Sequence, residues 1–372
     1  MIDLEPYQQS FDGEPGYLDW ASFGPLSPAV RAESSADAEL LGSGRRSSID
    51  LVAEHARDTQ ELVAELWGVD AAQVTLQPST TIGLMQAIHG LSGTLMLSRA
   101  EHASLTVTAA RASEARGLDL QWLDPVDGRV TAEVVREALT DDTTALAVSL
   151  VDARTGHRVD LTALREVLGD RLLIVNAAQG AGTLQAEFSA ADVVSASGST
   201  WLRAGRGTGF AWFGQRALER LVPVLSGVTG AEPDDGSGDV PPPVASAQAF
   251  TISVPDALAA ARLATALREV RDVGVDVIER ELAQRTGDVM FMADRYEVPV
   301  LTPREAESRA GIVTLAPAVR DAAPLAASLA NHGITVTVRA NLVRVAPHVG
   351  SGANTLRLFG DALAAFAATR VW

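Results

Sequence analysis

The stretch Ser197 to Phe210, SGSTWLRAGRGTGF, decides how the rest of this sequence is interpreted. It follows an apolar strand predicted at Asp192–Ala196 and runs into a further strand predicted at Gly209–Phe213. Its glycines let the backbone approach a ligand closely, and Arg206 adds a fixed positive charge. A hydroxyl-rich and glycine-rich loop at the end of a strand favours a site for a phosphate-bearing ligand.

Working outward from this loop, strand and helix patterns alternate from about residue 54 onward. The apolar runs predict strands at residues 74–76, 94–98, 118–123, 145–151 and 172–175, and helices at residues 54–67, 79–89, 102–116, 131–139 and 161–168. Such alternation predicts an α/β fold with a mostly parallel sheet that is covered on both faces. Ligands of such folds bind at the loops beyond the carboxyl ends of the strands.

The segment Ala231–Val244, AEPDDGSGDVPPPV, is rich in structure-breaking residues and is predicted to be a domain junction. We therefore expect a large cofactor-type domain at residues 16–240. A smaller α+β domain is expected from residues 1–15 and 246–372, with a long helix from Pro255 to about Arg285 and strands near residues 311–315, 335–338 and 342–345.

The composition excludes several classes of function. The chain has 372 residues and a net charge of −17, which argues against nucleic acid and anionic membranes as partners. It has no cysteine, so disulfides and thiolate chemistry are excluded, and it contains neither a metal-binding HExxH motif nor a GxSxG hydrolase motif. Residues 1–16 do not resemble a signal peptide, and no apolar run is long enough to span a membrane, so we expect a cytoplasmic protein.

The chain contains no lysine: all 30 of its basic residues are arginine. No side chain can therefore form a Schiff base with a carbonyl cofactor, and a Walker A loop is excluded because that motif requires a lysine.

Several motifs nevertheless occur in the order and spacing of a known family. They are YLDWAS at residues 17–22, Glu101–His102, TGHRVDL at residues 155–161, VNAAQGAG at residues 175–182 and SGSTWL at residues 197–202. Together they resemble the class V aminotransferase family of fold-type I pyridoxal phosphate (PLP) enzymes, which includes the cysteine desulfurases. The resemblance covers nearly the whole chain. It implies the family's fold, with a large domain built on a mostly parallel sheet and a smaller α+β domain.

The resemblance assigns four residues to a cofactor phosphate. Thr80 and Thr81, which follow a predicted strand and open a helix, would bind the phosphate together with Ser197. Thr208 would reach the phosphate of a neighbouring subunit, because sites in this family lie at a dimer interface. A homodimer is thus implied by the resemblance.

Other residues are assigned by the resemblance to the cofactor ring and to a small-molecule substrate. His102 would lie against the pyridine ring, although it also fits a structural histidine at a helix start. Gln179 would donate to the ring hydroxyl, or else hold the backbone of its own loop. Arg344 would clamp a substrate carboxylate, a task suited to a bidentate guanidinium, and Arg339 competes with it for this role.

Two positions depart from the family pattern. Thr200 occupies the position of the catalytic lysine, which holds the cofactor and moves protons at the substrate. Asn176 occupies the position of the aspartate that pairs with the pyridine nitrogen, and a neutral amide cannot stabilise a pyridinium. Both positions are therefore candidate catalytic positions that have lost their usual chemistry.

Three interpretations of the function remain open at this point. The first is a binding or regulatory protein that has lost Schiff-base PLP catalysis but keeps a pocket for a phosphorylated ligand. The second is an enzyme of altered chemistry that binds PLP or pyridoxamine phosphate (PMP) without a covalent bond, with His102 as base, or that uses no such cofactor. The third is a conventional PLP-dependent aminotransferase or lyase.

Overall fold

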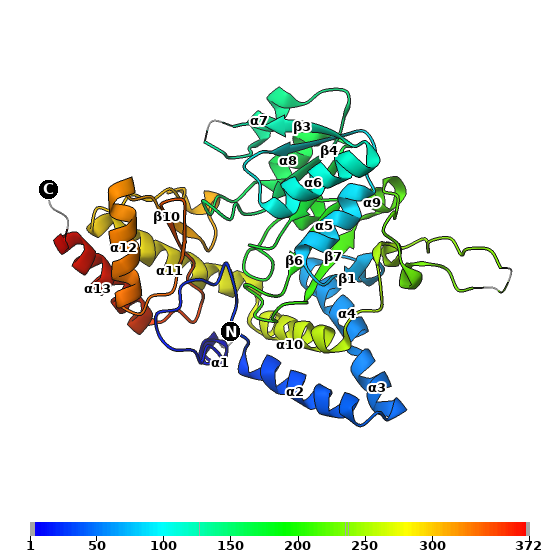
Figure 1. The fold of residues 1–372 in the computed structure, drawn as a ribbon, viewed down its shortest axis with the longest axis horizontal. Helices are drawn as coiled ribbons and strands as arrows, with labels where there is room; N and C mark the ends of the chain where they lie inside the picture. Colours follow the sequence, from blue (N-terminus) through cyan, green and yellow to red (C-terminus); the bar gives the residue numbers. More distant parts are fainter. Residues whose placement is uncertain (1–3, 126, 235, 237, 370–372) are drawn as a thin grey trace.

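The computed structural model describes residues 4–125, 127–234, 236 and 238–369, and it contains an α/β fold around a seven-stranded sheet (Figure 1). The strand order is β1-β7-β6-β5-β4-β2-β3, and β7 is antiparallel to both of its neighbours while the other pairs are parallel. The predicted mostly parallel sheet is thereby confirmed. The strands are β1 (Val74–Leu76), β2 (Thr94–Ser98), β3 (Asp119–Leu123), β4 (Thr143–Ser149), β5 (Leu172–Asn176), β6 (Val193–Ser197) and β7 (Gly209–Phe213).

Helices cover both faces of this sheet because successive strand residues point to opposite sides. In β5, Leu173 and Val175 join a core with α4 (His55–Trp67), α8 (Leu161–Leu168) and α10 (Ala257–Val273). Leu172 and Ile174 of the same strand join a second core with α5 (Thr80–His89) and α6 (Ala103–Arg116). The remaining helices before residue 250 are α1 (Leu4–Gln9), α2 (Pro28–Gly42), α3 (Arg46–Ala53), α7 (Ala132–Ala138) and α9 (Gln215–Arg220).

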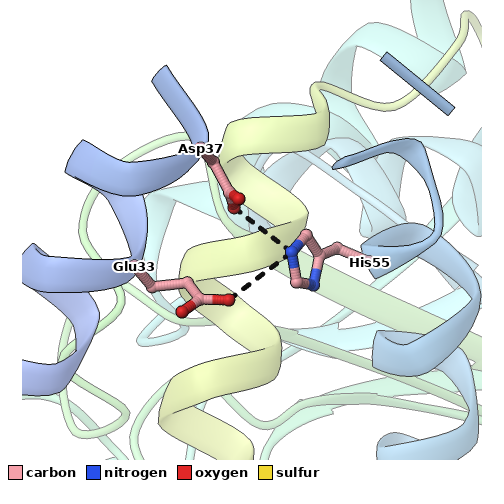
Figure 2. A group of neighbouring side chains, drawn as sticks. All are labelled: Glu33, Asp37 and His55. Atoms are coloured by element: carbon pink, nitrogen blue, oxygen red, sulfur yellow. Dashed lines mark ion pairs between the residues drawn. The ribbon is translucent and has the colours of Figure 1, made fainter. Parts of the chain in front are cut away.

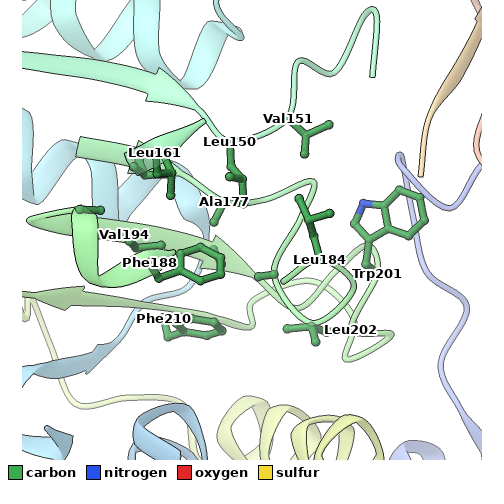
Figure 3. Packing of buried hydrophobic residues seen from close by; sticks show 14 of the residues in the cluster. Leu150, Val151, Leu161, Ala177, Leu184, Phe188, Val194, Trp201, Leu202 and Phe210 are labelled. Carbon is green, nitrogen blue, oxygen red and sulfur yellow. The ribbon is translucent and has the colours of Figure 1, made fainter. Parts of the chain in front are cut away.

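The first core continues beyond the strand ends into the loops that carry the family-like motifs. Figure 3 shows Val194 and Phe210 on the sheet and Trp201 and Leu202 on the loop that follows β6. Trp201 is 1% exposed and Leu202 is 2% exposed, so the segment directly after Thr200 is anchored by apolar packing. The position of Thr200 is therefore set by the core.

A smaller antiparallel sheet forms the other part of the molecule, on the left in Figure 1. Its order is β8-β10-β9, and it packs against the last helices of the chain through a third apolar cluster. The segment around Leu18 is bound to this sheet, because its N–H donates to Thr335 and its carbonyl accepts from Ala346. The elements are β8 (Val313–Leu315), β9 (Thr337–Arg339), β10 (Leu342–Val345), α11 (Val275–Arg295), α12 (Val319–Asn331) and α13 (Ala353–Thr369).

One sequence prediction of secondary structure was wrong. The long helix expected from Pro255 to about Arg285 is divided at Gly274 into α10 and α11. Gly274 has φ 93°, which is outside the helical range, and its N–H closes α10 by donating to Val270. α10 then packs on α2 and α4 beside the large sheet, whereas α11 continues toward the small sheet.

The predicted junction Ala231–Val244 forms an excursion whose two ends are paired to each other. Glu232 donates to Pro242, and Val244 donates to Gly230. Two of its residues, 235 and 237, lie outside the described residues, as do residues 1–3 and 370–372 of the predicted small domain. The domain limits stay a prediction. In the described part of the chain, no helix has the length and apolar character needed to cross a membrane.

The backbone at Thr200 packs closely against Gly24, and this contact predicts that a larger residue at position 24 destabilises the protein. A Cβ atom on Gly24 would lie 1.8 Å from the backbone oxygen of Thr200. We expect Gly24→Ala to lower the free energy of unfolding by about 1–3 kcal/mol, since backbone must move to accept the methyl group. Urea denaturation measures this, with Gly42→Ala as control because a Cβ there meets no described atom within 4 Å. Equal stability of the two variants would contradict the predicted clash.

Candidate ligand-binding site

A cavity of about 710 Å³ opens at the carboxyl ends of β4, β5 and β6, beside the start of α5. Ser149, Asn176 and Ser197, each the last residue of its strand, line it from the large sheet. Thr337, Arg339 and Arg344 line it from the small sheet. This is the edge at which parallel α/β sheets bind their ligands.

The cavity brings together most of the residues singled out in the sequence. Its lining includes Thr80, Thr81, His102, Asn176, Gln179, Ser197, Thr200, Arg339 and Arg344. Thr208 is the exception: it is 2% exposed, lines a neighbouring apolar pocket, and its hydroxyl donates to Gly205 within its own loop at 2.5 Å. Its role toward a second subunit stays a prediction.

One end of the cavity is built for an anion. Ser79 caps α5 by accepting a hydrogen bond from the N–H of Ile82, so the free N–H groups of the first helical turn lie at this end. Thr80 lines the cavity and is 6% exposed, and its buried hydroxyl has no hydrogen-bond partner among the described residues. An unpartnered buried hydroxyl is costly, so rotation of this side chain toward a ligand oxygen would be favourable.

The charge of the cavity is opposite to that of the protein. Four arginines line it, namely Arg154, Arg206, Arg339 and Arg344, and none of the lining residues that the structure describes is aspartate or glutamate. The whole chain carries a net charge of −17. Arg154 and Arg344 pair with Asp152 and Asp19, which do not line the cavity, so the excess positive charge comes from Arg206 and Arg339. Guanidinium groups over hydroxyl-rich walls favour an anionic ligand.

Arg344, which the resemblance assigned to a substrate carboxylate, is held by contacts from two other segments of the chain. Its guanidinium donates to the carbonyl of Ala153 and to the hydroxyl of Ser22, and it lies 3.6 Å from a carboxylate oxygen of Asp19. Burial lowers the pKa of Arg344, while Asp19 acts in the opposite direction. Its Nε is buried without a hydrogen-bond partner in the described part of the chain.

Asn176 organises a chain of hydrogen bonds at the floor of the cavity. Its Nδ2 donates to the hydroxyls of Ser104 and Ser149, at 3.3 Å each, and its Oδ1 accepts from the N–H of Ala178 at 3.1 Å. Ser149 in turn donates to Glu101 Oε2 at 2.5 Å. Each hydroxyl accepts a hydrogen bond from the amide N–H and can donate its own O–H to the next group, so the amide at position 176 sets the direction of these hydrogen bonds.

These hydrogen bonds determine whether His102 can donate a hydrogen bond to a ligand or accept one from it. The Nδ1 atom of His102 accepts from the N–H of Ser104 at 3.2 Å and lies 2.9 Å from the Ser104 hydroxyl. Burial, together with Arg339 and Arg344, lowers the pKa of His102, so the imidazole stays neutral. A neutral imidazole with Nδ1 as acceptor carries its proton on Nε2. His102 therefore presents a hydrogen-bond donor rather than a base.

Glu101, the residue before His102, lies at the other end of this chain of hydrogen bonds. Its carboxylate accepts from both the N–H and the hydroxyl of Ser149. Burial raises the pKa of Glu101, although these two hydrogen bonds act in the opposite direction. A second carboxylate at position 176 would also turn to Ser149, so the neutral amide there avoids crowding two negative charges on one hydroxyl.

Thr200 and Gln179 are both occupied by contacts within the protein. The Thr200 hydroxyl donates to the carbonyl of Ala178 at 3.2 Å. The Gln179 amide donates to Ala21 at 3.0 Å and accepts from the indole N–H of Trp201 at 2.8 Å. Gln179 thus connects the N-terminal segment to the Thr200 loop, whereas the sequence suggested contacts with the backbone of its own loop. Its role toward a ring hydroxyl stays a prediction.

Three polar residues of the site were not predicted from the sequence. Ser104 and Ser149 connect Asn176 to His102 and Glu101, and Arg154 lines the cavity. The signals that could have revealed them are modest: Ser104 lies two residues after His102, and Ser149 ends a predicted strand as Asn176 does. Arg154 pairs with Asp152 and faces the cavity only through the turn at residues 152–156.

The sequence was compared with family models and with known proteins, and it is similar to PLP-dependent enzymes of one family. A family model described as aminotransferase class-V matches residues 19–345. A cysteine desulfurase IscS of Ectopseudomonas mendocina is 30% identical over 190 residues, 47% of this chain and 47% of that protein, so the match spans about half the length of this relative. A kynureninase of Deinococcus radiodurans is 28% identical over 309 residues, 77% of this chain and 74% of that protein.

A solved structure shares the fold over almost its full length. It is a lysine-to-alanine variant of C-DES in which glycine is covalently linked to the PLP cofactor. Its TM-score with this chain is 0.87 at 18% identity, and the match covers 99% of both chains. The expected fold-type I architecture is thereby confirmed.

Proposed function

This chain belongs to the class-V aminotransferase family, and we propose that it binds a small, multiply anionic ligand in the family's pocket without forming a Schiff base to it. The observation that carries the proposal is the charge of the cavity, which is lined by four arginines and, among the described residues, by no acidic side chain in a protein of net charge −17. Such a ligand would place a phosphate at the end of the cavity formed by the start of α5 and a carboxylate at the end near Arg344.

The residues present fit one half of a pyridoxal-type cofactor and not the other. The helix start and the unpartnered Thr80 hydroxyl suit its phosphate. The nitrogen of its ring would meet no carboxylate at the usual position, since Asn176 stands there and its amide is engaged by Ser104, Ser149 and Ala178. We therefore assign no catalytic step to such a cofactor here.

In this proposal Thr200 stands at the position of the family's lysine, and the protein is a member that has lost Schiff-base catalysis. The absence of lysine from the sequence supports this, because no ε-amino group exists anywhere in the chain. A conventional PLP-dependent aminotransferase or lyase would require that group for both covalent attachment and proton transfer. We consider that interpretation the weakest of the three.

An enzyme of altered chemistry is the second candidate, and the C-DES variant favours it. That protein holds glycine linked to PLP although a lysine has been replaced by alanine. Replacement of one lysine in that protein is therefore compatible with glycine linked to its PLP cofactor. In this chain His102 would hold such a ligand by donating from Nε2, because its Nδ1 already accepts from Ser104. A base for proton abstraction would have to come from the ligand or from solvent.

A homodimer is part of the proposal, with Thr208 near the second subunit. The exposed side chains of Ile252 and Val254 line the same neighbouring apolar pocket as Thr208, which supports an interface on this side. Sedimentation equilibrium would measure the oligomeric state.

The Thr80 hydroxyl provides a test of ligand binding. We expect Thr80→Val to weaken the binding of PMP by about tenfold, because a hydrogen bond to a charged phosphate is lost. The same change is expected to raise the free energy of unfolding of the free protein by about 1 kcal/mol, because an unsatisfied buried hydroxyl is removed. Calorimetric titration and urea denaturation measure the two effects.

The controls distinguish specific binding of the phosphate group from nonspecific binding of the ligand to the positively charged cavity. Pyridoxamine without its phosphate is expected to bind much more weakly than PMP. Thr162→Val, an exposed threonine of α8, is expected to change neither affinity nor stability. If the wild-type protein binds neither PMP nor PLP, or binds pyridoxamine equally well, the proposed phosphate site is wrong.

A further inference from the structure

A second polar cluster lies away from the cavity, where α2 meets the start of α4 (Figure 2). It consists of Glu33 and Asp37, one turn apart on α2, and His55, the first residue of α4. The His55 Nε2 atom lies 3.2 Å from Asp37 Oδ2 and 3.5 Å from Glu33 Oε1. None of the three residues lines the candidate ligand-binding cavity.

The buried carboxylate of this cluster has no arginine partner among the described residues, whereas the similarly buried Asp192 pairs with Arg165 and Arg216. Asp37 is 5% exposed, and within the described residues its Oδ2 atom has no hydrogen-bond partner beyond the contact with His55. Over the residues that the structure describes, no arginine is recorded in an ion pair with Glu33 or Asp37. A buried carboxylate requires a compensating charge, because its desolvation is costly.

The charges of the cluster favour a divalent cation. Two carboxylates with a neutral imidazole carry a charge of −2, and even a protonated imidazole leaves −1. A divalent cation bound by the two carboxylates and a neutral His55 brings the total to zero. The same cation would compensate the charge on Asp37 Oδ2, which now contacts His55 Nε2 at 3.2 Å.

The donor atoms lie at separations that a zinc ion could bridge. In a tetrahedral site with metal–ligand bonds of about 2.0–2.1 Å, neighbouring donor atoms lie about 3.3 Å apart. The two distances from His55 Nε2, 3.2 and 3.5 Å, bracket this value. All three donor atoms lie within 4.8 Å of one another. One nitrogen and two carboxylate oxygens suit Zn²⁺, whereas Mg²⁺ prefers oxygen ligands in octahedral geometry.

We propose that Glu33, Asp37 and His55 form a zinc-binding site that joins α2 to α4 where both helices pack on α10. Three protein ligands leave the fourth position for water, and the Glu33 side chain, which is 37% exposed, leaves the site open to solvent. The site is independent of the ligand proposed for the cavity, since the two share no residue.

Calorimetric titration of tag-free, chelator-treated protein with Zn²⁺ tests the proposal. We expect one Zn²⁺ per chain, no comparable binding of Mg²⁺, and a rise in the melting temperature on addition of Zn²⁺. Asp37→Asn, His55→Gln and Glu33→Gln should each weaken Zn²⁺ binding at least tenfold. Glu33→Gln is the safest of these for folding, because Glu33 is the most exposed of the three ligands.

A matched histidine variant provides the control. His89→Gln removes a histidine from the end of α5, outside the cluster, and is expected to leave Zn²⁺ binding unchanged. The proposal is overturned if the wild-type protein binds no Zn²⁺, or if His55→Gln and Glu33→Gln bind it as tightly as the wild-type protein does. Loss of binding in His89→Gln, with binding kept in His55→Gln, would likewise overturn it by assigning the metal to a different site.

Discussion

Thr200→Lys combined with Asn176→Asp is expected to give this chain a Schiff base with PLP that the wild-type protein cannot form. The wild-type sequence has no lysine, so treatment with PLP and borohydride should leave no modified side chain. In the double variant we expect a visible absorbance band and, after reduction, one stable pyridoxyl group on residue 200. Peptide mass spectrometry locates the group. The expected change is from no attachment at a side chain to nearly one group on residue 200 per chain.

The structure indicates why both substitutions are needed. The Thr200 hydroxyl lies at the cavity wall, with Ala178 as its partner, so a longer side chain there can extend into about 710 Å³ of space. Position 176 lies at the floor of the same cavity and would again place a carboxylate opposite a pyridine nitrogen. The new carboxylate would also compete with Glu101 for the Ser149 hydroxyl, which now donates to Glu101. We therefore expect Asn176→Asp alone to be less stable than the double variant with PLP bound.

Thr200→Arg is the control, because it adds a positive charge at the same position without a primary amine. It should show neither the absorbance band nor the attached group. If the double variant fails to bind PLP while remaining folded, the cavity has been remodelled beyond these two positions. If the wild-type protein with PLP gives the same absorbance band, Schiff-base formation does not depend on a lysine at position 200, and the prediction is wrong.

Much of the fold could be predicted from the sequence because the periodic signals are local. The strands at residues 74–76, 94–98 and 209–213 were predicted with the bounds that the structure gives. The break at Gly274 was missed, because a single glycine within a helical pattern is compatible with both a continuous and a divided helix. Its φ of 93° results from the different packing surfaces of α10 and α11, which local sequence does not specify.

The sequence predicted which residues form the candidate site, but it did not predict the hydrogen bonds between them. Motif order placed Thr80, His102, Asn176 and Thr200 in one pocket, and the cavity contains all four. Motif order does not specify the direction of hydrogen bonds, so His102 was considered as a base. The contact from the Ser104 N–H to Nδ1 is what makes it a donor. Such directions depend on the positions of three separate strand and helix ends.

His348 was not singled out from the sequence, yet the structure makes it the histidine with the largest expected effect on stability. It is fully buried among Tyr7, Phe11, Trp20 and Trp201, and it is held by Val349 and by the carbonyl of Trp201. Burial, reinforced by Arg203, lowers the pKa of His348 from its ordinary 6.5 to about 3. The folded protein therefore keeps this imidazole neutral over most of the acid range.

Acidification is expected to destabilise the protein through His348. Below pH 6.5 the unfolded chain takes up a proton at this position, whereas the folded chain does so only near pH 3. Stability is thus lost as the pH falls through this window, by about 1.4 kcal/mol for each pH unit from this residue alone. His348→Gln has no such proton to gain, so its free energy of unfolding should fall less steeply between pH 6.5 and pH 4. Urea denaturation at several pH values measures the two slopes.

The test of His348 is the slope of the free energy of unfolding against pH, compared between the wild-type protein and His348→Gln. The stability at a single pH does not identify His348 as the cause of the acid sensitivity. His348→Gln loses packing and the hydrogen bond accepted from Val349, so it will be less stable than the wild-type protein near pH 7. The two curves should approach each other as the pH falls, because only the wild-type protein loses the contribution of a buried neutral imidazole. His332→Gln, at the end of α12 and away from the aromatic cluster, should keep the wild-type slope. Parallel curves for His348→Gln and the wild-type protein would show that other groups cause the acid sensitivity.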